Sequence, residues 1–500
     1  MSNTNYDRLP FMDASFLIFE SENSPLHVAA TVIYEAGPFR LKNGGIDVDR
    51  FRESTRLLLH RIPRYRQKLA WIPVVKHPVW VDDEHFELDY HIRHTSLPQP
   101  GSIEQLKKLS ARIMAQPLDH ARPLWESWVV EGLEGDRFAW ISKLHHCMID
   151  GSAGQELAQI LMSPDPEHRV SGEAPRYFPR PAPSERDLLR DEMGRYAGLG
   201  GRALRGLASL ASGKSELRKD LEGRLGAFRR AFSSSDGAPS QTPLNGENGP
   251  HRRFDWLDMS LADVKAVRRA LGCTVNDVVL AIVSGAVRDF LLRRSIRVED
   301  LDFRVSAPVS IRSEDEKGEM GNRVSMWYLH LPIDEKDPLE RVERIHAETQ
   351  ELKESKVALD ADAIMGVVEW TPTVLMSLAG RASSGSTPYN LMVTNVPGPQ
   401  FPLYLEGAKM LAQYAQVPLA DGTALGVALV SYDGKLFWGF NADYELVPDL
   451  EYFVKAIATS FNELARAAGV ETEGDSAAAV KEGAADEGAA ADATTEEGEA

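Results

Sequence analysis

This 500-residue chain has few cysteines, no excess of positive charge and no long hydrophobic segment. The only two cysteines are Cys147 and Cys273, so no disulfide framework is expected, which suits a reducing cytoplasm. The formal net charge of −18 argues against nucleic acid as a partner. No apolar run reaches the roughly 18 residues of a membrane-spanning helix, and the N-terminal residues lack the pattern of a signal peptide.

Several catalytic motifs are absent as well. The chain has no G-x-S-x-G pentapeptide, no Walker loop and no G-x-G-x-x-G after a strand. These absences disfavour an α/β-hydrolase, nucleotide hydrolysis and dinucleotide redox chemistry. Neither H-E-x-x-H nor a cysteine and histidine set at zinc-ligand spacing is present, so we expect no metal and no bound cofactor.

The most informative segment is His-His-Cys-Met-Ile-Asp-Gly, which runs from His145 to Gly151. Alternation before it predicts a strand that ends at the histidines, and adjacent residues on a strand point to opposite faces. The two histidines therefore have different roles, and we assign the general base to His146 and a supporting role to His145. Asp150 is expected to fix the loop, and Gly151 suits positive φ or close backbone approach.

Two alternatives compete with this interpretation of the motif. A pair of adjacent histidines is more often a satisfied structural pair than a site. The second alternative is that Cys147 acts as a nucleophilic thiol. This alternative is less favoured, because cysteine often serves as a small buried apolar residue.

Further segments narrow the identification. His145 to Gly151 matches the HHxxxDG motif of the CoA-dependent acyltransferase superfamily, and the ordered set of segments resembles the bacterial wax ester synthase/acyl-CoA:diacylglycerol acyltransferase family from about Leu9 to about Ala465. Cys147 and Thr394 depart from residues common in that family, which affects the expected substrate preference and not the reaction type. The other matching segments are Pro117-Leu118-Asp119, Pro123-Leu124-Trp125-Glu126, Val275-Asn276-Asp277 to Ala281, Pro308 to Arg312, Gly321-Asn322 and Thr394-Asn395-Val396-Pro397-Gly398-Pro399.

The resemblance implies a reaction in which an alcohol attacks an acyl-CoA thioester directly, without an acyl-enzyme. His146 would take the alcohol proton and return it to the departing thiolate. Asn276 is the candidate oxyanion donor, because its amide donates without titrating. An equal alternative makes Asn276 a helix N-cap.

The remaining matched residues are assigned to substrate binding or to structure. Asp277 is expected to support backbone geometry, while Asn395 and Gly398 are expected to shape a tight loop, although plain turn chemistry explains that loop equally well. Pro123, Leu124 and Trp125 are also assigned to substrate binding or to structure. Taken alone, this segment indicates the start of a core strand.

The length predicts two domains plus additional segments. The resemblance implies an α/β (α+β) fold of two chloramphenicol-acetyltransferase-like domains with the active site at their interface. We expect an N-terminal domain at 1–183, a basic, partly helical linker at 184–250, a C-terminal domain at 251–468 and an acidic tail at 469–500.

The linker and the tail differ sharply in charge. An apolar stripe from Leu217 to Phe232, flanked by arginines, predicts a basic amphipathic helix that either lies on an anionic membrane or lipid-droplet surface or packs between the domains. The segment from Glu471 to Ala500 holds ten acidic residues and one lysine, half of the net charge, and is expected to be disordered. We therefore expect a cytoplasmic protein associated peripherally with the inner membrane face or with lipid inclusions.

The implied substrates are long-chain acyl-CoA with diacylglycerol, a long-chain fatty alcohol, or both. One alternative is a condensation-type enzyme that uses a carrier-protein thioester. Another is a non-catalytic lipid-droplet surface protein, although a coat protein needs no His-His-Asp motif.

Overall fold

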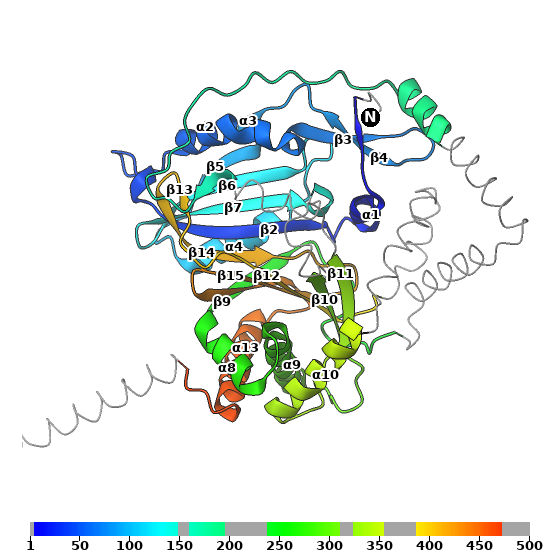
Figure 1. Ribbon diagram of the computed structural model, residues 1–500, viewed down its shortest axis with the longest axis vertical. Coiled ribbons are helices and arrows are strands. Elements are labelled where there is room, and N and C mark those ends of the chain that lie inside the picture. Colours follow the sequence, from blue (N-terminus) through cyan, green and yellow to red (C-terminus); the bar gives the residue numbers. More distant parts are fainter. Residues whose placement is uncertain (1–4, 149–159, 196–237, 311–323, 355–386, 473–500) are drawn as a thin grey trace, which may run out of the picture.

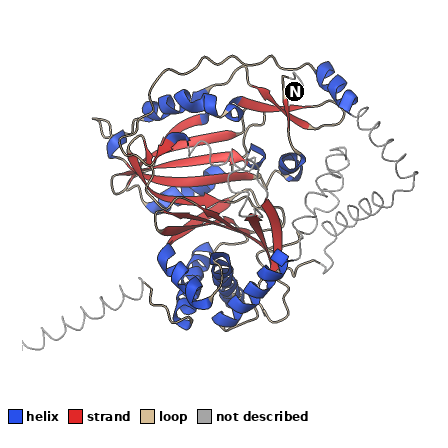
Figure 2. Cartoon of the chain, viewed as in Figure 1, coloured by secondary structure: helices blue, strands red, loops and turns tan. Residues whose placement is uncertain are grey.

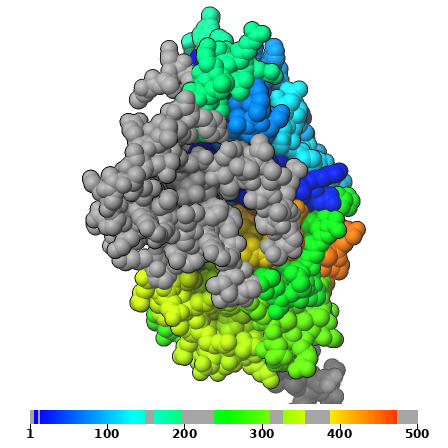
Figure 3. All heavy atoms as spheres, turned by 90° about the vertical axis from the view of Figure 1, so that its right-hand side faces the viewer, coloured from blue at the N-terminus to red at the C-terminus, as the bar shows by residue number. Residues whose placement is uncertain are grey.

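The computed structural model describes residues 5–148, 160–195, 238–310, 324–354 and 387–472. Within these ranges two large β-sheets occupy the middle of the molecule, with helices on their outer faces (Figure 1, Figure 2). The N-terminal part, blue to cyan, and the C-terminal part, green to yellow, lie at opposite ends of the long axis (Figure 3). The expected α/β architecture with two chloramphenicol-acetyltransferase-like halves is confirmed.

The first sheet is built mainly by the N-terminal half. Its central strands pair antiparallel, with His27 directly opposite His145. Both strands carry runs of consecutive apolar residues, and most of their side chains are buried on both faces of the sheet. The sheet order is β5 (Ile92–Ser96), β6 (Trp125–Leu133), β7 (Arg137–His145), β2 (His27–Glu35), β14 (Ala408–Gln416), β13 (Tyr404–Leu405) and β8 (Met162–Ser163).

Helix α4 (Ile103–Ala115) packs against β2 and β7 and also against the second half of the protein. Its start is a capping box in which Ser102 and Gln105 each accept the other's backbone N–H. Its end is capped by Lys143 of β7, whose fully buried Nζ donates to two carbonyls at the helix C-terminus. The other helices of this half are α1 (Phe11–Phe19), α2 (Val48–Leu58) and α3 (Leu88–His91).

The second sheet has six strands and belongs to the C-terminal half. The helices α8, α9, α10 and α13 cover the face that points away from the first sheet (Figure 1). Helix α9 is apolar on all sides and almost wholly buried, so it forms the centre of this half's core. The sheet order is β11 (Val324–His330), β10 (Arg304–Ser310), β12 (Leu391–Pro397), β15 (Leu425–Tyr432), β16 (Lys435–Asp443) and β9 (Arg252–Ser260), and the helices are α8 (Leu261–Leu271), α9 (Val275–Arg293), α10 (Pro338–Glu354) and α13 (Leu450–Ala467).

The two halves exchange a strand, which the domain boundaries drawn from the sequence do not anticipate. β13 and β14, within the segment 251–468, leave the C-terminal half and complete the N-terminal sheet, where β14 pairs antiparallel with β2. The physical reason is that β2 would otherwise present an open sheet edge. An ion pair of 2.6 Å between Lys107 of α4 and Asp255 of β9 adds a second connection between the halves.

A small third sheet lies beside the linker region. It contains β1 (Asp7–Arg8), β4 (Pro78–Asp82) and β3 (Gln67–Trp71), and a helix over 185–195 packs on it through Leu188. Residues 238–250 are irregular and contain no helix or strand. The predicted amphipathic stripe at 217–232 and the acidic tail from residue 473 lie outside the described residues.

Several of these elements follow from local sequence patterns. Apolar residues at helical spacing lie along α2 and α4, and Asp433-Gly434 forms the turn of the hairpin of β15 and β16. In the part of the chain that the structure describes, no single helix is long and apolar enough to cross a bilayer. The consecutive helices α8 and α9 are long and apolar enough only when they are counted as one segment, and the chain bends by 99° between them.

Candidate active site

The two histidines of the motif stand where β7 ends, and the backbone there is held from both sides. The His145 N–H donates to the carbonyl of Leu124, and the His146 N–H donates to the carbonyl of Leu26, each at 2.9 Å. His146 begins a 3-10 turn over His146–Met148. The chain direction at the motif is therefore fixed by two neighbouring segments rather than by the loop itself.

Leu124 belongs to the Pro-Leu-Trp segment, and the structure gives this segment a supporting position. Pro123, Leu124 and Trp125 are all buried where β6 begins. The Trp125 indole N–H donates to the carbonyl of Tyr65 at 2.8 Å, and its ring stacks on His91 with 4.5 Å between centroids. The segment is thus the start of a core strand whose first carbonyls anchor the end of β7.

His146 projects away from the sheet towards helix α1. Its ring stacks on Phe16 with 3.8 Å between centroids and an interplanar angle of 19°. The Nδ1 atom is buried and has no hydrogen-bond partner in any other described residue. Burial, with a smaller contribution from His145, lowers the pKa of His146 to about 4, so its imidazole is neutral at cellular pH.

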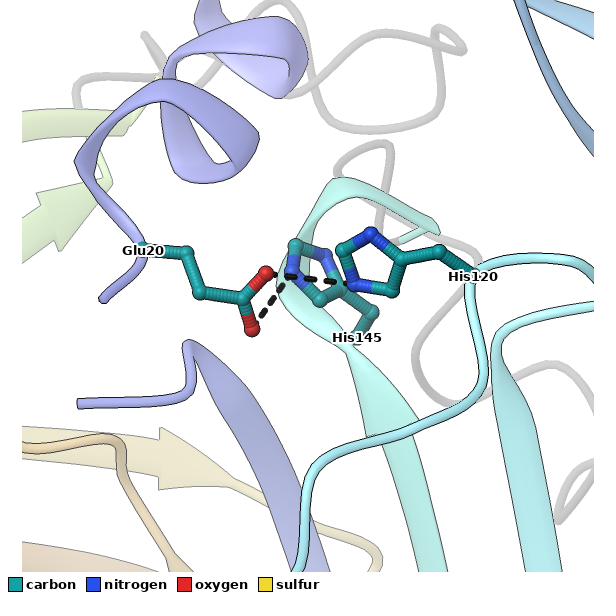
Figure 4. Close-up of side chains that lie close together, drawn as sticks. All are labelled: Glu20, His120 and His145. Atoms are coloured by element: carbon teal, nitrogen blue, oxygen red, sulfur yellow. Dashed lines mark ion pairs between the residues drawn. The ribbon is translucent and has the colours of Figure 1, made fainter. Parts of the chain in front are cut away.

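His145 lies in a polar cluster that the sequence did not predict (Figure 4). Its Nε2 lies 3.4 Å from Oε1 of Glu20, and Nε2 of His27 lies 3.6 Å from the same oxygen. His120 approaches the other carboxylate oxygen at 3.2 Å. The two motif histidines therefore have different neighbours, since His145 lies among polar groups and His146 lies against Phe16.

Glu20, His120 and His145 offer atoms within 4.8 Å of one another, a spacing that could hold a metal ion. The hydrogen bonding of His145 disfavours this use. The Cys147 N–H donates to Nδ1 of His145 at 3.1 Å, so Nδ1 is an acceptor and the ring proton is on Nε2, the atom that would have to bind the metal. The donor set therefore fits an arrangement in which the Nε2–H of His145 faces the Glu20 carboxylate better than it fits a metal centre.

The residues after His146 complete the motif only in part. Cys147 is buried, and burial holds the pKa of its thiol well above the usual range, so a nucleophilic thiolate is disfavoured. Asp150 and Gly151 lie outside the described residues, and their predicted roles remain predictions.

Asn276 and Asn395, predicted from separate segments, lie together. The side-chain NH2 of Asn395 donates to Oδ1 of Asn276 at 2.8 Å, which leaves the NH2 of Asn276 with no bond to another described residue. Asn276 is exposed in the first turn of α9. It is not the helix N-cap, because the cap is Thr274.

Asp277 is buried at the start of α9, where its carboxylate accepts several hydrogen bonds. It forms a capping box with Thr274 and accepts hydrogen bonds from Thr349 at 2.9 Å and from His346 at 2.7 Å. Burial alone would raise the pKa of this carboxyl, but the bonds from His346 and Thr274 lower it overall. The residue thus ties α9 to α10.

Gly398 follows β12 at a position where the backbone has almost no free space. A Cβ at this position would lie 2.3 Å from the carbonyl oxygen of Ser431. The Gly398 N–H donates to Oγ of the same serine at 3.2 Å. The backbone at Gly398 therefore approaches that of Ser431 too closely to leave room for a side chain.

No described hydrogen bond or ion pair joins Asn276, Asn395 or Gly398 to His146. The structure brings these predicted residues into two groups, one at the end of β7 and one where α9 meets β12. Sequence reasoning missed Phe16, Glu20 and the two histidines that complete the buried cluster. Of these four residues, only His120 had a local signal in the sequence, because it directly follows the matched Pro-Leu-Asp segment.

Solved structures with a similar architecture show the fold to which this chain belongs. The first condensation domain of the calcium-dependent antibiotic synthetase superposes with a TM-score of 0.56 at 14% identity, covering 94% of this chain and 98% of that one. The wax ester synthase/diacylglycerol acyltransferase from Marinobacter aquaeolei VT8 superposes with a TM-score of 0.63 at 24% identity, covering 93% of this chain and 100% of that one. These likenesses show that the chain has the two-domain chloramphenicol-acetyltransferase-like fold.

Sequence comparison identifies the family. The pattern of the wax ester synthase/diacylglycerol acyltransferase catalytic domain matches residues 9–279, and that of the WS/DGAT C-terminal domain matches residues 320–465. A Mycobacterium tuberculosis protein named as a probable diacylglycerol O-acyltransferase, tgs2, is 31% identical over 92% of this chain and 98% of its own length. The chain belongs to the wax ester synthase/diacylglycerol acyltransferase family.

Proposed function

We propose that this protein transfers a long-chain acyl group from acyl-CoA to diacylglycerol, to a long-chain fatty alcohol, or to both, with His146 as general base. The observation that carries the proposal is a buried, neutral imidazole fixed at the end of β7 within the HHxxxDG motif. Membership in the family supports the substrate class.

In the proposed reaction the free ring nitrogen of His146 takes the proton of the acceptor hydroxyl as its oxygen attacks the thioester carbonyl. The carbonyl π electrons move to oxygen and form a tetrahedral oxyanion. When this intermediate collapses, the carbon–sulfur bond breaks and the imidazolium gives its proton to the CoA thiolate. No acyl-enzyme forms, and atoms and charge balance over the two steps.

For the oxyanion we propose Asn276 as donor. Its Oδ1 is engaged by Asn395, which turns its NH2 towards the opposite side, and an amide donates without changing charge. Asn276→Ala should lower kcat by about tenfold to a hundredfold, with a smaller change in KM. Asn395→Ala should produce a weaker effect of the same kind, since Asn395 only orients the donor.

We further propose that the protein works on the cytoplasmic side, at the surface of a membrane or lipid inclusion, because its acceptors are insoluble in water. Exposed Trp71 and Val74 in the β3–β4 turn, together with Met193 of the helix over 185–195, support such an encounter. Vesicle flotation with and without anionic lipid tests it. Equal recovery with and without vesicles would contradict it.

The test of the proposed function is acyl transfer by the purified chain. Palmitoyl-CoA is supplied with hexadecanol, with dioleoylglycerol or with neither, and CoA and ester are both quantified. The proposal predicts release of CoA that depends on an acceptor. Release without an acceptor, or transfer only from a carrier-protein thioester, would contradict it.

A further inference from the structure

We propose that Glu20 is a positioning residue for His146, holding the backbone on both sides of that histidine through His145 and through Leu26. This inference rests on the proposed function, since His146 is the base that Glu20 would position. Glu20 itself makes no described contact with the His146 ring, so it is not a catalytic residue.

The first connection runs through His145. Its Nδ1 accepts the Cys147 N–H at 3.1 Å, which requires the ring proton to reside on Nε2. That Nε2 lies 3.4 Å from the carboxylate of Glu20, and a negative charge there favours the protonated nitrogen (Figure 4). Glu20 thus selects the tautomer that can hold the amide immediately after His146.

The second connection runs through Leu26. The Leu26 N–H donates to Oε1 of Glu20 at 3.3 Å, and the Leu26 carbonyl accepts the His146 N–H at 2.9 Å. The carboxylate therefore acts on the amides of two successive residues, His146 and Cys147. Each connection passes through a single intermediate residue.

The charge of Glu20 persists over the working pH range. Burial opposes ionisation, but the Nε2 atoms of His120 and His145, which face the two carboxylate oxygens, hold the pKa of this carboxyl well below its usual range. Two rings, those of His27 and His145, are completely buried. Because few other groups can compensate for the loss of this carboxylate, its removal should be felt at the turn.

His120 provides a matched control. It contacts the other oxygen of the same carboxylate, at 3.2 Å, but its side chain is 39% exposed. It makes no described bond to the backbone of the His146 turn. Loss of His120 therefore removes a partner of Glu20 without breaking either connection to His146.

The kinetic test uses Glu20→Leu, Glu20→Gln and His120→Asn, with palmitoyl-CoA as donor. Glu20→Leu should lower kcat by about tenfold to a hundredfold with KM for the donor changed less than about threefold. Glu20→Gln should recover part of the loss, because its carbonyl oxygen can still accept from Nε2–H. His120→Asn should stay within about threefold of the wild type, and equal losses in Glu20→Leu and His120→Asn would overturn the proposal.

A double-mutant cycle isolates the connection through His145. His145→Asn offers a side-chain oxygen to the Cys147 N–H without needing a tautomer to be selected. Glu20→Leu should therefore cost at least about threefold less in the His145→Asn background than in the wild type. Strictly multiplicative losses would contradict this connection.

A spectroscopic readout separates this inference from the proposed function. In protein labelled with 15N-histidine, the His145 ring, assigned by loss of its signals in His145→Asn, should show a protonated Nε2 and a bare Nδ1. In Glu20→Leu, and partly in Glu20→Gln, the populations should shift towards Nδ1–H. A wild-type Nδ1–H tautomer, or no shift in Glu20→Leu, would overturn the proposal even if the protein transferred no acyl group.

Discussion

The depressed pKa of His146 leads to a specific pH profile for turnover. With a pKa of about 4, roughly 97% of His146 remains neutral at pH 5.5, whereas a histidine with the ordinary value of 6.5 would be only about 9% neutral. The kcat of the wild type should therefore change by less than about twofold between pH 7.5 and pH 5.5. An ordinary histidine would lose about tenfold over the same interval.

The physical cause of the shift can be perturbed directly. Phe16→Ala removes the ring stacked 3.8 Å from His146 and admits water to the imidazole, so the pKa should rise towards 6.5. In this variant kcat should fall several-fold at pH 5.5 while staying near its own maximum at pH 7.5. Phe19→Ala is the matched control, because Phe19 lies on the same helix but is 49% exposed.

The assay measures CoA release at saturating palmitoyl-CoA by chromatography, with circular dichroism at each pH to confirm that the fold persists. A wild-type midpoint near pH 6.5 would refute the assignment of a buried, neutral base. An unchanged profile in Phe16→Ala would refute burial by α1 as the cause.

Three further predictions concern stability. Burial lowers the pKa values of His77 and His91 to about 4, so the unfolded chain binds more protons than the folded one below pH 6.5. Stability should then fall as the pH drops from 6.5 to 4, by up to about 3 kcal/mol per histidine, and urea titrations that gave a constant unfolding free energy would contradict this. Gly398→Ala should cost about 1–3 kcal/mol in the same urea assay at pH 7.5, because its Cβ would collide with the Ser431 carbonyl, and an unchanged midpoint would show that the loop yields freely. Lys143→Met should lower the thermal midpoint through a loss of about 1–3 kcal/mol, since the carbonyls of Ile113 and Gln116 at the end of α4 lose their donor, and a midpoint at or above that of the wild type would refute the capping role.

The parts of the fold that local patterns encode could be predicted from the sequence. The strand that ends at His145 and the hairpin at Asp433-Gly434 follow from alternation and turn chemistry, which depend on residues close in the chain. The pairing of β14 with β2 could not be predicted, because a strand's pattern states which face is buried and not which strand lies beside it.

The same distinction holds at the site. His146 could be predicted because it belongs to a contiguous motif that follows a strand with a clear local pattern. His27 could not, since only the register of β2 against β7 brings it opposite His145. Glu20 could not either, since it reaches His145 from the end of α1, and no local spacing reveals how α1 packs. The stacking of Phe16 on His146 likewise depends on the packing of α1 against the turn, which no local spacing reveals.

The most direct test of the central claim is a single-turnover transfer experiment with His146→Ala. The wild type and the variant, matched by circular dichroism, are mixed with radiolabelled palmitoyl-CoA and dioleoylglycerol or hexadecanol, and the labelled ester is quantified. We expect the variant to form ester about a hundredfold to ten-thousandfold more slowly, with palmitoyl-CoA binding preserved. Ester formation by His146→Ala at the wild-type rate would contradict the account.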